Sequence, residues 1–221
     1  MLFDLRSRGR RRTVQAVYLG LALLMGGGLV LFGVGAGNGF GGILNAFTGS
    51  GSGGSQKQVV SQAEKDATRQ TQLQPQNPAG WAALVQARWT SASQGNNYNA
   101  NTNTFTAAGK HELTATTQAW QQYLKLTPKP DPSLAILAAR AYTAQGDYAG
   151  ATGAWETETL GTPGESKGYQ CLAVNAYAAK QTQKGDLAAT KAVSLAPVAS
   201  RATLKQTLQQ AQKNPQLAQG C

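Results

Sequence analysis

The sequence is poor in the side chains on which most enzyme active sites depend. Its 221 residues include one histidine, His111, two cysteines, and 10 acidic residues against 20 lysines and arginines. General acid–base catalysis and metal binding draw mainly on histidine, carboxylate and cysteine side chains. The chain contains no HExxH, CxxC, GxSxG or P-loop motif, and no GxGxxG between a strand and a helix. These absences argue against an enzyme, and they predict neither a cofactor nor a metal site.

Charge is also missing from a long N-terminal stretch. No charged residue occurs from Thr13 to Gln56, and half of the 26 glycines lie between Gly26 and Gly54. A soluble globular domain is not built in this way. Residues 37–56, which are rich in Gly and Ser, instead predict a flexible linker.

The apolar part of this stretch has the length of a membrane span. The 21 residues from Val14 to Val34, as a helix, would extend roughly 31 Å, which is about the hydrocarbon thickness of a bilayer. The apolar region of a cleaved signal peptide is usually about 7 to 15 residues long. We therefore predict an uncleaved transmembrane signal anchor over residues 13–36. Cleavage near Gly35-Ala36-Gly37 is the competing interpretation.

Basic residues before the span predict its orientation. Five arginines and one aspartate, Asp4, give residues 1–12 a net charge of +4, and residues 57–221 carry +6. Positive residues are retained on the cytoplasmic side, so we expect a single-pass plasma-membrane protein with a cytoplasmic N-terminal tail and an extracytoplasmic C-terminal domain. The mild positive charge of that domain fits weak attraction to lipid headgroups or wall polymers better than nucleic-acid binding. The topology signal consists of Arg6, Arg8, Arg10, Arg11 and Arg12.

Beyond Gln56 the sequence is typical of helices. Ala, Gln, Leu and Lys dominate runs of 12 to 20 residues, with apolar residues three and four apart and no alternating strand pattern. We predict an all-α domain that opens with a leading helix over residues 57–74. Further helices are expected at about 132–145, 148–159, 167–181, 184–195 and 199–213.

The helical region has an internal period. Trp120 and Trp155 are 35 residues apart, as are Pro128 and Pro163, and Pro197 follows Pro163 by 34. A recurrence of about 34 residues with two helices each is the period of tetratricopeptide repeats (TPRs). The clearest unit carries Ala138, Ala139, Tyr142, Gly146, Asp147, Tyr148, Ala151, Trp155 and Pro163.

These residues resemble the TPR family. The resemblance implies a TPR-like α-solenoid of helix pairs over residues 75–197, with a capping helix and tail at 198–221. The one N-terminal transmembrane helix, predicted from the apolar run, precedes this domain. Arg88 stands where the pattern prefers tyrosine, and an asparagine-rich insertion from Gly95 to Thr106 replaces a tight turn. A non-repeating helical bundle is the alternative.

In TPR domains the first helix of each pair lines a concave groove that commonly holds an extended peptide or a partner helix. Aligning the three first helices brings one set of side chains into register, and these could bond a peptide backbone, pair with a carboxylate or supply apolar area. The alternative is that they are ordinary solvated positions. The set consists of Gln86, Arg140 and Asn175, with Trp89 and Thr143 one turn along.

The anchor and the resemblance together suggest a protein-interaction adaptor of a bacterial cell envelope. Its expected partner is an envelope protein or peptide, and we expect contact with the membrane through the N-terminal helix and none with nucleic acid. Two alternatives stay open: a chaperone-like accessory of the secretion translocon, and a wall-polymer-binding or structural envelope protein.

The two cysteines, Cys171 and Cys221, can pair in an oxidising compartment, or they can stay separate as thiols. His111 is expected at the surface. The insertion is expected to be an irregular surface loop, or a contact loop for a partner.

Overall fold

The computed structural model describes residues 53–221, with side chains from residue 62 onward. The predicted cytoplasmic tail, the signal anchor and most of the linker lie outside the described residues. Among the helices at 53–221, none combines the length and the apolar character that a membrane crossing needs.

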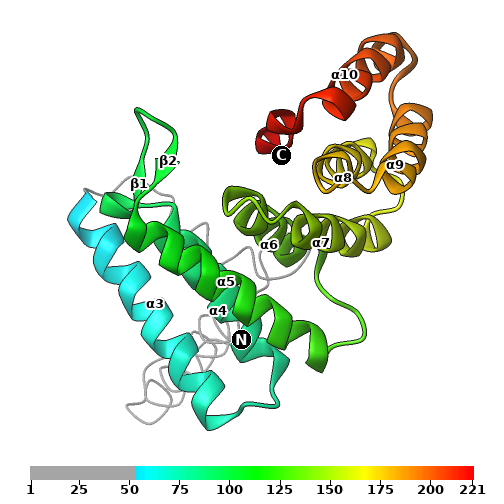
Figure 1. Cartoon of the computed structure of the whole chain (residues 1–221). Helices are drawn as coiled ribbons and strands as arrows, with labels where there is room; N and C mark the ends of the chain where they lie inside the picture. The colour runs from blue at the N-terminus through cyan, green and yellow to red at the C-terminus, as the bar shows by residue number, and fades with distance from the viewer. Residues whose placement is uncertain (1–52) are drawn as a thin grey trace, which may run out of the picture. The chain divides into compact units, whose positions relative to one another are not determined.

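The described residues form a mostly helical domain of paired helices (Figure 1). The α-helices are α3 (Gly53–Leu73), α4 (Pro78–Ala92), α5 (Ala107–Leu126), α6 (Pro132–Ala144), α7 (Tyr148–Gly161), α8 (Ser166–Ala178), α9 (Thr182–Leu195) and α10 (Arg201–Lys213). The short elements are the 3-10 helices η1 (Gly95–Asn97), η2 (Val198–Ser200) and η3 (Pro215–Gly220), and the strands β1 (Tyr98–Asn99) and β2 (Thr104–Phe105).

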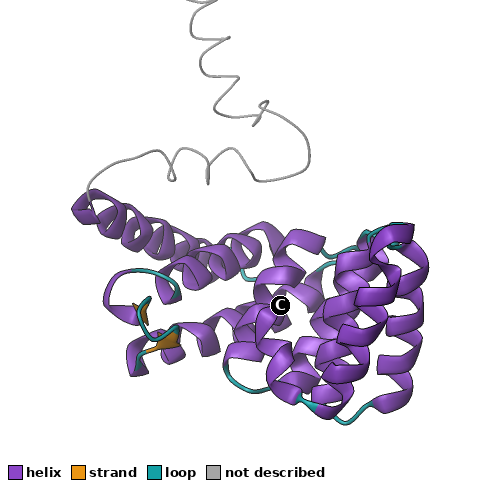
Figure 2. Cartoon of the chain, turned by 90° about the horizontal axis from the view of Figure 1, so that it is seen from above, coloured by secondary structure: helices purple, strands orange, loops and turns teal. Residues whose placement is uncertain are grey.

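Helices that follow one another in the chain pack against one another. The pairs α4–α5, α6–α7 and α8–α9 make the most extensive contacts, α3 covers α4, and α10 lies across α8 and α9. Figure 2 shows the helices stacked side by side, with the small hairpin at one end. This sequential packing is consistent with a helical repeat, as the periodicity predicts.

The helix starts follow directly from local chemistry. Asn77 and Asp131 each precede a proline at the first helical position, and each side chain accepts a hydrogen bond from the amide two residues on. Asp147 caps α7 in the same manner, by accepting from the Gly150 amide. Proline fits the first turn of a helix, and an Asn or Asp side chain satisfies an amide that has no helical partner.

The 35-residue period is visible as the same contact made twice. The ring of Tyr142 on α6 packs against Gly150 on α7, and the ring of Tyr177 on α8 packs against Gly185 on α9. A Cβ atom at Gly150 would lie 2.5 Å from the Tyr142 ring, and one at Gly185 would overlap the Tyr177 ring in the same way. Burial raises the pKa of both tyrosines. Equivalent positions in successive pairs therefore have equivalent environments.

Small residues make up much of the core between the pairs. Ala135, Ala138 and Ala139 on α6 and Ala173 on α8 are fully buried, and they let neighbouring helices approach closely. The larger buried side chains fill the remaining space. These are Trp120, Leu113, Leu134, Val85 and Trp155.

One carboxyl group is buried where α7 meets α8. Glu158 is 3% exposed, and its carboxyl group occupies the space that a side chain at Gly168 would take. One oxygen accepts a hydrogen bond from the Thr162 hydroxyl at 2.6 Å, and the other has no partner among the described residues. Burial raises the pKa of Glu158, and the nearby Glu165 adds to this rise, against the hydrogen bond from Thr162.

The tyrosine–glycine contact can be tested with two glycines of one helix. Gly150→Ala forces the Tyr142 ring to move, so we expect the free energy of unfolding to fall by about 1–3 kcal/mol. Gly153→Ala on the same helix meets no atom within 4 Å, so it should raise that free energy by about 0.5–1 kcal/mol through helix propensity. Urea denaturation measures both, and equal effects would contradict the proposed packing.

The buried carboxyl group predicts a pH dependence of stability. Because the folded chain holds the Glu158 pKa above its unfolded value of about 4.3, its contribution to stability is complete below that pH. The contribution is lost as the pH rises through the folded pKa. Glu158→Gln has no proton to lose, so its Tm relative to the wild type should rise between about pH 4 and pH 8. Glu156→Gln, on the same helix but 41% exposed and paired with Lys184 at 2.6 Å, is the control and should show no such rise.

Candidate functional site

The five residues predicted to bind a partner lie on the first helices of three successive pairs. Gln86 and Trp89 are on α4, Arg140 and Thr143 are on α6, and Asn175 is on α8. Their exposure differs sharply: Arg140 is exposed and Gln86 and Trp89 are half-buried, whereas Thr143 is 4% exposed and Asn175 is fully buried. Only Gln86, Trp89 and Arg140 therefore present side chains to an incoming partner.

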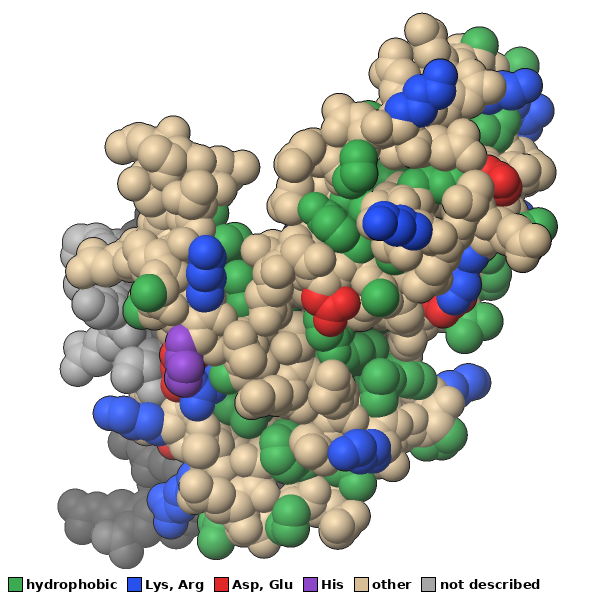
Figure 3. Space-filling view, in the orientation of Figure 1, with side chains coloured by type: hydrophobic (Ala, Val, Ile, Leu, Met, Phe, Trp, Pro, Cys, Tyr) green, Lys and Arg blue, Asp and Glu red, His purple; other side chains and the backbone are tan. Residues whose placement is uncertain are grey.

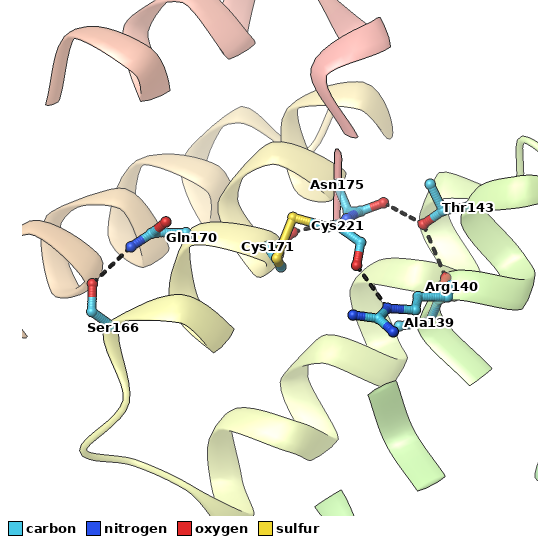
Figure 4. Close-up of a disulfide and its surroundings, with 8 residues drawn as sticks. All are labelled: Ala139, Arg140, Thr143, Ser166, Gln170, Cys171, Asn175 and Cys221. Atoms are coloured by element: carbon cyan, nitrogen blue, oxygen red, sulfur yellow. Dashed lines mark hydrogen bonds between the residues drawn. A yellow bond between two sulfur atoms is a disulfide. The ribbon is translucent and has the colours of Figure 1, made fainter. Parts of the chain in front are cut away.

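Thr143 and Asn175 instead hold two helix pairs together. The Thr143 hydroxyl donates to the Asn175 side-chain oxygen at 2.9 Å, and it lies equally close to the Ala139 carbonyl (Figure 4). The Asn175 amide donates to the Cys171 carbonyl at 2.9 Å. A buried amide with both ends bonded fixes α6 against α8, since leaving either end unpaired would be costly.

A segment at the C-terminal end of the chain covers this part of the surface. Residues 214–221, here named the C-terminal segment, pack on α8 and α6. Cys221 forms a disulfide with Cys171 on α8, with the two Cα atoms 5.5 Å apart. The Arg140 Nε–H donates to the Cys221 carbonyl at 2.9 Å (Figure 4). The sequence left the pairing of the cysteines open, and nothing in its local pattern indicated that this segment lies across α6 and α8.

An open cleft of about 490 Å³ remains beside the C-terminal segment. The space-filling view shows the hollow between the projecting hairpin and the C-terminal half of the domain (Figure 3). Its walls come from α4, the hairpin, α6 and the C-terminal segment. The lining residues are Trp89, Ser93, Tyr98, Asn103, Phe105, Arg140, Thr143, Ala144, Gln219, Gly220 and Cys221.

The hairpin that forms one wall is a feature that the sequence did not predict. The asparagine-rich insertion was expected to be an irregular loop, but Tyr98 pairs with Phe105 in an antiparallel register. The Thr106 amide donates to the Asn97 carbonyl at 2.9 Å, and Phe105 packs on a buried cluster with Leu113. Strands of two residues have no readable alternation, so only these contacts in the folded chain define the hairpin.

The chemistry of the cleft is aromatic on one side and positive at one point. The Tyr98 and Phe105 ring centroids lie 5.0 Å apart, and Trp89 adds a third ring to the lining. Arg140 is the one charged residue among those that line the cleft. Only its Nε–H donates within the described chain, so the guanidinium can bond a carboxylate or a carbonyl of a partner.

A charged cluster near the first pair has a structural role. Arg88 on α4 bridges Glu64 on α3 and Glu112 on α5, with each nitrogen–oxygen distance 2.8 Å. Burial raises the pKa of Glu64, and the Arg88 charge opposes that rise. Arg88 departs from the repeat pattern because it ties three helices together. His111 is 77% exposed beside this cluster, and the described residues contain no group of three or more side chains able to hold a metal ion.

Comparison with known proteins adds no relative. No protein-family model matches this chain, and neither a curated protein nor a solved structure matches it.

The structural role of Asn175 predicts how two groove positions differ. Asn175→Ala removes the bond to Thr143 that joins α6 and α8 and the bond to the Cys171 carbonyl within α8, so we expect the free energy of unfolding to fall by about 1–3 kcal/mol. Gln86→Ala, at a half-buried position on α4, should change it by less than about 0.5 kcal/mol. Thermal and urea denaturation measure the stability of both variants. An Asn175→Ala protein as stable as the wild type would show that the bonds are dispensable.

Proposed function

We propose that this protein is a membrane-anchored adaptor with a TPR-like domain that binds an extended peptide or a partner helix on the extracytoplasmic side of a bacterial plasma membrane. The observation that carries the proposal is the cleft, in which three aromatic rings lie beside the Arg140 guanidinium, whose two terminal nitrogens have no partner among the described residues. Aromatic and arginine side chains dominate binding energy at protein interfaces.

The repeated contacts support the TPR-like assignment. Tyr142 with Gly150 and Tyr177 with Gly185 repeat at the 35-residue spacing, and the helix pairs follow one another in sequence and in space. A stack of such pairs leaves its first helices along one face, which is where these proteins receive their ligands.

Two features support the proposed location. The disulfide between Cys171 and Cys221 is typical of an oxidising compartment. The apolar stretch at Val14–Val34, preceded by five arginines, has the pattern of an anchor with a cytoplasmic N-terminus. Anchoring raises the local concentration of the domain near other membrane proteins, so weak contacts in the cleft can suffice.

In-cell crosslinking tests this function. Photoreactive residues placed at Trp89 or Asn103 of the full-length protein should crosslink one dominant envelope or membrane protein, because both positions line the cleft. The same probe at Leu187, which is 75% exposed on α9, is the control and should give background adducts only. Mass spectrometry identifies the adducts.

Charge reversal sharpens the test. Arg140→Glu should reduce recovery of the partner at least about tenfold, since a bidentate arginine–carboxylate contact is worth about that factor or more. Lys205→Glu, on the exposed face of α10, should leave recovery unchanged. Full recovery with Arg140→Glu contradicts the cleft as the binding site.

The crosslinked adducts also test the alternatives. Adducts confined to cytoplasmic proteins contradict the orientation, and a broad spread of exported chains would support the translocon-chaperone alternative instead.

A further inference from the structure

The C-terminal segment is held down by few contacts besides its disulfide. From Asn214 to Gly220 only Ala218 is buried, and Leu217 is 38% exposed. The Gln219 side-chain amide donates to the Thr143 carbonyl at 3.3 Å and to the Tyr148 hydroxyl at 3.4 Å, which are long bonds. One buried methyl group and a few exposed hydrogen bonds do not order eight residues, so the covalent bond at Cys221 keeps the segment in place.

The surface beneath the segment has the character of a ligand site. Cys171, Asn175 and Thr143 are buried, and they lie on α8 and α6, the first helices of two successive pairs. Arg140 and Thr143 bond to the backbone or a side-chain amide of the segment, and Ala218 packs with its small side chain into the core cluster. The segment binds mostly as the 3-10 helix η3, and its contacts are of the kind that a groove makes with a bound peptide: bonds to its backbone and amides, and a pocket for one small side chain.

We propose that the C-terminal segment is a resident occupant of the α6–α8 part of the groove, and that reduction of the Cys171–Cys221 disulfide releases it. The exposed surface then accepts a peptide of the same chemistry, with a small apolar side chain beside a side-chain amide and a carbonyl that meets Arg140. The binding of a natural partner at this surface depends on the proposed function. The release of the segment and its replacement by a peptide do not depend on it.

The chemistry of release is thiol–disulfide exchange with a dithiol. A thiolate of the dithiol attacks the Cys221 sulfur, since Cys171 is fully buried and Cys221 is partly exposed. The Cys171 thiolate leaves and takes up a proton, and the second thiol of the dithiol displaces Cys221. The dithiol becomes a disulfide, and its two electrons reduce the protein bond to two thiols. We expect helix α10 to stay docked, because Leu208 and Ala211 have their own place in the core cluster.

Alkylation of Cys171 measures whether the segment leaves. In the full-length Cys221→Ser variant, we expect a maleimide to modify Cys171 at least about a hundredfold faster than global unfolding allows, because local opening suffices to expose it. Ala218→Asp added to this variant should accelerate the reaction further, since it places a carboxylate in the pocket of the segment. Leu217→Asp is the matched control and should have little effect. Circular dichroism and urea unfolding establish that each variant is folded.

A synthetic peptide tests the exchange. Residues 214–221 carrying the Cys221→Ser change, added at about ten times its Kd, should slow alkylation of Cys171 by about tenfold, because it occupies the opened surface. Wild-type protein treated with dithiothreitol should behave as the variant does. Modification of Cys171 no faster than unfolding would overturn the release, and a peptide without effect would overturn the exchange. Neither readout needs a natural partner, so a failed crosslinking experiment leaves both intact.

Discussion

The close approach of consecutive helices is the constraint on which the domain depends. Glycines face tyrosine rings at Tyr142–Gly150 and Tyr177–Gly185, and fully buried alanines line the contacts between pairs. Without a Cβ atom at these glycines, each ring fills the gap between two helices, and the pairs α6–α7 and α8–α9 make the same contact. Such repetition is consistent with a stack, in which each pair buries the apolar face that its neighbour leaves open.

Stacking alone does not decide which surface stays open for a ligand. On the first helices, Thr143 and Asn175 are hydrogen-bonded to each other between α6 and α8, and Arg88 is paired with two carboxylates. Burial favours internal bonds for such polar groups, because an unpaired buried group is costly. Trp89 is half-buried and Arg140 is exposed, and both line the cleft that we propose as the binding site.

The C-terminal segment connects the cleft with the disulfide. The C-terminal segment covers the α6–α8 face and at the same time forms a wall of the cleft through Gln219, Gly220 and Cys221. The bond to Cys171 therefore holds in place the segment that forms this wall of the cleft.

Local pattern in the sequence determined the helices, their period and their starts. Asn77 and Asp131 before prolines, and apolar residues three and four apart, act within one helix, so they are legible without a structure. The membrane anchor and its orientation also derive from the sequence alone, and they stay predictions. The tertiary structure decided the burial of Asn175, the hairpin at Tyr98 and the position of Cys221. The burial of Asn175 and the position of Cys221 depend on contacts between residues far apart in the chain, and the hairpin depends on the packing of Phe105 on the buried cluster around Leu113. No local periodicity encodes which distant side chain will bond a polar group or cover a helix face.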